Sequence, residues 1–243
     1  MGLSGSRGLH RHRANIRWPY GFLALYQPED LGNADRLTQS LGEVWEGDGL
    51  SLKPYPCFRP SHAAIDAAIA LHRELQLGSQ TIEIASVIIE TDEGSWRDQL
   101  APGTTRRRPA HVIEAQFATP FLVATALVKG RVTIDDVAEV TNATVLTLAD
   151  SIDGRPVAGK ERGWARLVVT LTNGRSAAHE VANPSGSPAA PIDDDALNAK
   201  FRDCARHAIA PLSDLTVTSA IAAIRTLPNA IDVRQIFATL PMR

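Results

Sequence analysis

The residues best suited to chemistry lie close together, between positions 53 and 62. They supply an ammonium, a phenol, a thiol, a guanidinium and an imidazole, from Lys53, Tyr55, Cys57, Arg59 and His62. Pro54 and Pro56 interrupt this run, and a proline disposes the residue before it toward extended backbone. We therefore expect Lys53 and Tyr55 in an extended, stiff loop, with their side chains on opposite sides of the chain.

This loop leads into a predicted helix over residues 61–78. Ser61 is a favourable N-cap, His62 falls in the first turn, and Gly78 is a helix-ending residue. A helix N-terminus offers free backbone N–H groups and a partial positive charge. Together with the nearby cationic side chains, it suits a carboxylate. The sequence therefore predicts an anion-binding site here.

Composition narrows the class of protein. The chain has 243 residues, of which 44% are hydrophobic and 21% charged, with a net charge of −2. This balance argues against a nucleic-acid-binding role. Cys57 and Cys204 lie far apart, without zinc-site spacing, and indicate a reducing compartment. No apolar run is long enough to span a membrane and no secretory leader is present, so we expect a cytoplasmic protein.

The middle of the chain predicts an α+β fold. The apolar, β-branched run at 81–91 is expected to be a central strand. Residues 164–172 and 175–181 are predicted to form an antiparallel hairpin around Asn173 and Gly174. Helices are expected at 117–130, 133–140 and 144–152, with a loop at 153–163. The arginines at 106–108 are interpreted as solvated surface, with an anion clamp as the alternative.

The C-terminal part predicts helices at 193–209, 212–227 and 230–240. Leu197, Phe201, Cys204 and Ala208 share one face of the first helix, and we expect them to be its buried stripe. The acidic residues at 193–195 are expected to complement the helix dipole rather than bind a metal. Apolar surface on these helices is expected to exceed what the α+β part covers, which favours association.

Five blocks of the sequence resemble the MmgE/PrpD family, in family order over about residues 14–240. The run from Lys53 resembles its "KPYPC…TH…AIDA" segment, and residues 114–121 resemble its "AQFSLPY" run. Residues 20–24 resemble the segment before the lysine, 169–174 a "VTLADG" strand and turn, and 191–205 a "PLSDEELEAKFRDCA" helix. The family includes 2-methylcitrate dehydratases, cis-aconitate decarboxylases and an iminodisuccinate epimerase.

The resemblance implies a lid-type α+β domain and a site for a di- or tricarboxylate. It implies a flexible segment at 1–19, the lid-like domain at 20–190 and a helical segment at 191–243. The implied activity is a cofactor-independent lyase of propionate metabolism, 2-methylcitrate dehydratase-like, with a decarboxylase or epimerase as alternatives. Lys53 and His62 are the implied catalytic residues, and Arg59, Tyr55 and Phe121 are assigned to substrate binding.

Several features leave other interpretations open. Phe121 stands where many relatives have tyrosine, and Phe58 where some have histidine. Lys53 could instead form a surface ion pair, and His62 could cap or pack at the helix start. The resemblance covers only the second half of family members, whose helical first half carries most catalytic groups. We therefore expect a partner, either a separate N-terminal helical half or another copy, or else a non-catalytic carboxylate-binding module or an inactive product.

Overall fold

The structure is a computed structural model that describes residues 38–78, 84–102 and 106–234. The chain divides into two compact units, Met1–Gly49 and Leu50–Arg243. In the first unit the described residues form turns and a short 3-10 helix, η2 (Glu46–Gly49). The predictions for residues 1–19 and 20–26 lie outside the described residues.

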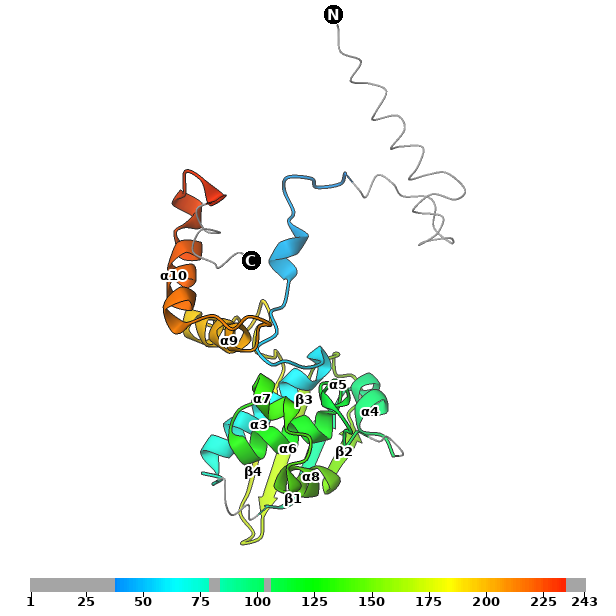
Figure 1. The fold of residues 1–243 in the computed structure, drawn as a ribbon. Helices are drawn as coiled ribbons and strands as arrows, with labels where there is room; N and C mark the ends of the chain where they lie inside the picture. Colours follow the sequence, from blue (N-terminus) through cyan, green and yellow to red (C-terminus); the bar gives the residue numbers. More distant parts are fainter. Residues whose placement is uncertain (1–37, 79–83, 103–105, 235–243) are drawn as a thin grey trace, which may run out of the picture. The chain divides into compact units, whose positions relative to one another are not determined.

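A four-stranded mixed sheet, in the order β2-β1-β3-β4, is the framework of the second unit (Figure 1). Its strands are β1 (Ile84–Thr91), β2 (Ile152–Pro156), β3 (Ala165–Leu171) and β4 (Ser176–Val181). The β3–β4 hairpin and the internal position of β1 confirm those predictions. The α+β class is confirmed, with one correction: β2 pairs parallel to β1, where a helix end and a loop were expected.

Three helices form the core with this sheet. They are α3 (His62–Glu74), α6 (Thr119–Lys129) and α8 (Ala143–Asp150), with α3 packed on β3, β4 and α6. The sheet face toward them is apolar, since every second residue of β3 is buried. Helix α6 has Pro120 in its first turn and Gly130, whose φ is +67°, as its C-cap, as predicted. The helix after the lysine loop is thus fixed against a buried partner.

Shorter elements complete this α+β body: η3 (Arg59–Ser61), α4 (Glu93–Gln99), α5 (Val112–Ala115) and α7 (Ile134–Ala138). The solvated-surface interpretation fits Arg108, whose side chain is 60% exposed, whereas Arg106 and Arg107 are half-buried, and each of the three binds an acceptor of the chain. Arg106 donates to the Phe117 carbonyl (2.8 Å), Arg107 to the Ile152 carbonyl (2.9 Å), and Arg108 to Asp150 (2.5 Å). They connect loops and strands to one another.

The C-terminal helices are α9 (Asp194–Arg206) and α10 (Asp214–Arg225), followed by η4 (Leu227–Asn229). The expected buried stripe of α9 is wrong: Ala205 is its one buried residue, Leu197 is 42% exposed, and Cys204 is exposed. Residues 230–234 are not α-helical, and 235–240 lie outside the described part. None of the described helices is long and apolar enough to cross a bilayer.

The apolar surface expected on these helices is present. Its members are large aliphatic side chains of the last described forty residues that remain in contact with solvent: Leu197, Ile209, Leu215, Ile224, Leu227, Ile231 and Val233. The cause is simple, since α9 and α10 pack mainly on each other. Amphipathic periodicity correctly marks an apolar face, but it does not say whether this chain covers that face.

Candidate functional site

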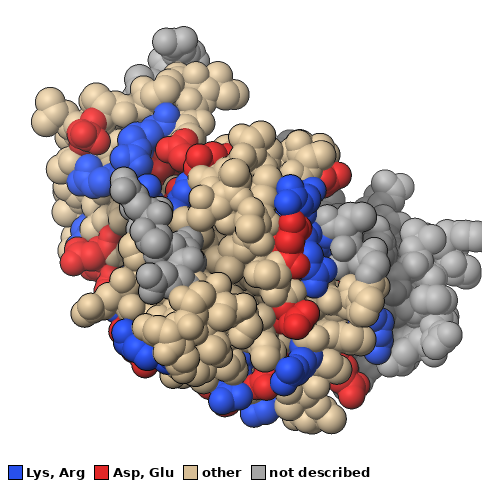
Figure 2. Space-filling model, turned by 90° about the horizontal axis from the view of Figure 1, so that it is seen from below, with Lys and Arg blue, Asp and Glu red and all other residues tan. Residues whose placement is uncertain are grey.

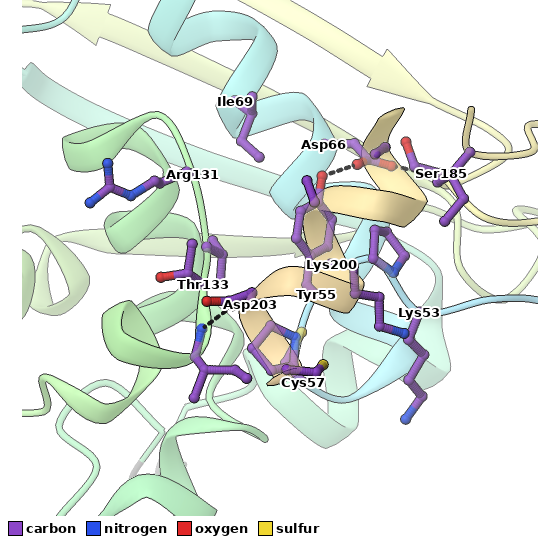
Figure 3. A pocket seen from close by; sticks show the side chains of 18 of the residues that line it. Lys53, Tyr55, Cys57, Asp66, Ile69, Arg131, Thr133, Ser185, Lys200 and Asp203 are labelled. Carbon is purple, nitrogen blue, oxygen red and sulfur yellow. Dashed lines mark hydrogen bonds between the residues drawn. The ribbon is translucent and has the colours of Figure 1, made fainter. Parts of the chain in front are cut away.

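A cavity of about 1150 Å³ lies between the lysine loop, α3, the start of α7, and α9 (Figure 3). Its charged lining residues comprise five cations and three acids: Lys53, Arg73, Arg131, Lys200 and Arg206, with Asp66, Asp193 and Asp203. The excess of positive charge is local. On the face seen in Figure 2, charges of both signs are interspersed. The cavity is therefore distinguished by the sign of its lining, in a chain whose net charge is −2.

The lysine loop, residues 50–58, contains no regular strand and is held at both ends by backbone hydrogen bonds. The Leu52 N–H donates to the Gly186 carbonyl (2.8 Å), and the Phe58 N–H donates to the Gln116 carbonyl (2.8 Å). Lys53 lies just beyond the first of these bonds, and its side chain is exposed and lines the cavity. The loop thus presents Lys53 from an anchored backbone.

The Arg59 side chain is bonded to other parts of the protein and does not face the cavity. Its guanidinium donates to the Ser185 carbonyl (2.9 Å) and more weakly to the Pro184 carbonyl (3.4 Å). It also lies 3.2 Å from Nδ1 of His62. Because a guanidinium only donates, Nδ1 is the acceptor and the neutral imidazole carries its proton on Nε2. Arg59 does not line the cavity, so the structure does not bring it together with Lys53 as a ligand-facing pair.

His62 is completely buried under the loop. Burial, and next the Arg59 charge, lower the pKa of His62 from 6.5 to about 4. The side chain does not line the cavity. In this conformation His62 is a neutral support for Arg59, placed away from where a ligand would react. The packing interpretation of this residue agrees better with its position than the catalytic one.

Tyr55 lines the cavity and is fixed by a carboxylate that was not among the predicted site residues. Its hydroxyl donates to Asp66 Oδ1 (2.5 Å), and Asp66 Oδ2 accepts from the Ser185 N–H (2.7 Å). Burial, and next the Asp66 charge, raise the pKa of Tyr55, so the phenol stays protonated. Asp66 follows His62 by one helical turn, which is the signal that could have identified it.

Phe121 is placed elsewhere: it is fully buried in α6 and does not line the cavity. Two other aromatic residues line it instead, Phe58 and Phe117, whose ring centroids lie 5.3 Å apart. Cys57 is buried, and burial raises the pKa of its thiol to about 12. A thiol with that pKa is a poor nucleophile at neutral pH.

The cations and acids of the lining differ in how far they are already bonded. Within the described residues, Lys53, Arg73 and Lys200 form no ion pair, whereas Asp66 is hydrogen-bonded on both oxygens. Arg131 is paired with the buried Asp136 at 3.2 Å. No cluster of three metal-ligating side chains occurs in the described part of the chain. The arrangement can bind a small anion with several negative groups.

One comparison with known proteins identifies the family of this chain. The family model described as the MmgE/PrpD C-terminal domain matches residues 55–217, from Tyr55 of the lysine loop into α10. A comparison with curated proteins found no match. The matched residues contain the whole sheet, α3, α6 and α9, and they form most of the chain. This chain belongs to the MmgE/PrpD family, and residues 55–217 are its C-terminal domain.

Proposed function

We propose that the cavity binds a di- or tricarboxylate and forms part of a cofactor-independent lyase site, with 2-methylcitrate as the first substrate to test. The observation that carries this proposal is Lys53, an ammonium without an ion pair among the described residues, held by an anchored loop at a cation-rich cavity. A fixed cation of this kind favours a carboxylate. Membership of the family supports the same class of ligand.

In this proposal Lys53 binds a substrate carboxylate and stabilises negative charge that develops when the neighbouring carbon loses a proton. Tyr55 shapes the wall, with its hydroxyl proton directed to Asp66. Arg59 and His62 act indirectly, because they hold the loop against residues 184–185. Preorganisation of this kind matters because a cation that is already in position needs no rearrangement as the charge develops.

Proton removal also requires a base within reach of the substrate. Of the carboxylates that line the cavity, Asp66 is saturated by Tyr55 and Ser185. We propose that a second protein surface supplies the acid and base groups, either from a helical N-terminal half or from another copy of the chain. The exposed apolar residues of α10, such as Leu215 at 83% exposure, support such an association.

The proposal is tested first by binding. The 243-residue chain is titrated with citrate by calorimetry, beside the Lys53→Ala variant. Lys160→Ala is the matched control, because Lys160 stacks on the Trp164 ring, at 4.2 Å, and does not line the cavity. We expect Lys53→Ala to weaken citrate about tenfold, since charged hydrogen bonds contribute roughly 1.5–3 kcal/mol. Unchanged affinity would remove Lys53 from the site.

Turnover is the second test. The chain is incubated with 2-methylcitrate, alone and with a separately produced helical half, and the products are identified by mass spectrometry. We expect loss of water only in the combined sample. Turnover by the chain alone would contradict the need for a second surface. Consumption of cis-aconitate with release of CO2 would reassign the reaction to decarboxylation, and binding with no turnover in either sample would support a carboxylate-binding module.

A further inference from the structure

We propose that Lys200 of α9 binds a second carboxylate of the ligand held by Lys53, so that the cavity selects molecules with at least two carboxylates. This inference rests on the function proposed above and adds a residue and a selection rule to it. Lys200 lies far from the lysine motif in sequence, on a helix whose predicted role was packing. The argument depends on where α9 places this side chain and on which charges surround it.

Lys53 and Lys200 enter the same cavity from different elements (Figure 3). Lys53 comes from the loop before α3, and the Lys200 side chain leaves α9 toward that loop. Both positive charges also act on the buried imidazole of His62, which places them within electrostatic reach of one group. The two side chains therefore line the same cavity.

Among the described residues, no acid of the lining forms an ion pair with Lys53 or Lys200. Asp66 is saturated, as described above. Asp193 caps α9 by accepting from the Ala196 N–H (2.7 Å), and Asp203 accepts from the Arg206 guanidinium (2.9 Å). Two like charges that share a partly enclosed space repel each other. A ligand with two carboxylates removes this repulsion by pairing with both, whereas a monocarboxylate pairs with one.

Helix α9 is fixed to the α+β body beyond Lys200, which keeps the side chain in place. Nε2 of His207 lies 2.7 Å from Asp135 Oδ1, at the start of α7. The Ile134 N–H of the same turn donates to Asp203 Oδ2 (3.4 Å). These contacts connect the C-terminal end of α9 to α7. Lys200, one turn before Asp203, is therefore held over the cavity rather than on a free helix.

The experiment compares two ligands by NMR chemical-shift titration of the full chain: citrate, with three carboxylates, and isobutyrate, with one. Lys200→Ala is expected to weaken citrate about tenfold and to leave isobutyrate nearly unchanged. Lys200→Arg is expected to retain most of the citrate affinity, because it keeps the charge. Arg202→Ala is the matched control, since it removes one positive charge from the same helix outside the cavity lining.

The outcomes separate this inference from the proposal on which it rests. If wild-type chain binds citrate and Lys53→Ala weakens it, but Lys200→Ala equals Arg202→Ala, the inference alone is overturned. An equal loss for citrate and isobutyrate in Lys200→Ala would also overturn it, because no second carboxylate would be involved. If the wild-type chain binds no citrate, the proposed function fails, and the inference fails with it.

Discussion

Gly186 is the position where one added methyl group tests whether the anchoring of the lysine loop matters. Its φ is +82°, a region that L side chains rarely adopt. A Cβ at this position would lie 2.2 Å from the Leu52 carbonyl oxygen and 3.2 Å from Cδ of Pro54. The nearest contact is with backbone, so no rotamer change relieves it. The Gly186→Ala variant therefore has to displace the loop that carries Lys53.

The expected cost in stability has two parts. A non-glycine residue in left-handed backbone costs roughly 1–2 kcal/mol. Displacement of the loop also breaks the bond from the Leu52 N–H to the Gly186 carbonyl, which contributes about 1 kcal/mol. We expect Gly186→Ala to lower the free energy of unfolding by about 2–3 kcal/mol. Gly174→Ala is the matched control, because Gly174 has φ +84° and its added Cβ meets nothing within 4 Å.

The assay combines urea unfolding with citrate titration. Gly174→Ala is expected to show the conformational cost alone, about 1–2 kcal/mol, with unchanged citrate affinity. Gly186→Ala is expected to lose more stability and to bind citrate several-fold more weakly. The reasoning is refuted if the two variants bind citrate equally well, because Lys53 would then be positioned independently of its backbone anchor. Equal stability losses would show that the loop moves without cost.

Three further predictions concern the support of the site and the exposed helices. Tyr55→Phe removes the hydrogen bond to Asp66 and should lower the free energy of unfolding by about 1–3 kcal/mol, measured with urea. The lowered pKa of His62, about 4, favours the neutral form when folded, so stability should fall as pH drops from 6.5 toward 4, by up to about 3 kcal/mol. His62→Gln should remove that slope in unfolding experiments; an equal slope would assign it to other groups. Leu215→Ser should change stability by less than about 0.5 kcal/mol and reduce self-association in sedimentation, because Leu215 is 83% exposed; unaltered sedimentation would exclude this face from an interface.

Elements determined by their own residues could be predicted from the sequence. The Asn173–Gly174 turn sets the β3–β4 hairpin, and Pro120 and Gly130 delimit α6. The strand β2 could not be predicted, because Ile152 is its one buried residue and its stability comes from parallel pairing with β1. Parallel strand partners are distant in sequence, so no local pattern predicts their pairing.

At the start of α3 the predicted boundary is right, but the predicted capping interaction is absent. Ser61 precedes the helix, as an N-cap should, but its backbone is already helical and its hydroxyl bonds Thr119 Oγ1 (2.8 Å) instead of capping. A preceding 3-10 turn, η3, starts the helix in its place. The residue type indicated the boundary correctly, while the interaction that fixes it came from α6. Tertiary partners can thus take over a side chain that a local rule assigns to the helix.

The residues of the candidate site also differ in whether local sequence or tertiary packing identifies them. Lys53 and Tyr55 were identified because a proline-rich run and a helix start mark them locally. Asp66 and Lys200 lie within the family-like blocks but were not assigned to the site, because they join the cavity through the packing of α3 and α9. Phe121 was assigned to the site from a motif position, but the helical turn it occupies faces the core. Motif membership locates a segment; the helix phase decides which of its residues face a ligand.

In the proposed site, the lysine motif therefore contains one cation that binds the ligand, Lys53, and one that binds the protein, Arg59. Arg59 is bound to carbonyl oxygens of residues 184–185 and to His62, so its charge is used in holding the loop. If Arg59 were the ligand cation, the loop would lose that attachment whenever substrate bound. Lys53, on the far side of the two prolines, is anchored through its backbone neighbour and keeps its ammonium available. On this proposal, Lys53 binds the ligand while Arg59 and the neutral, buried His62 support the loop.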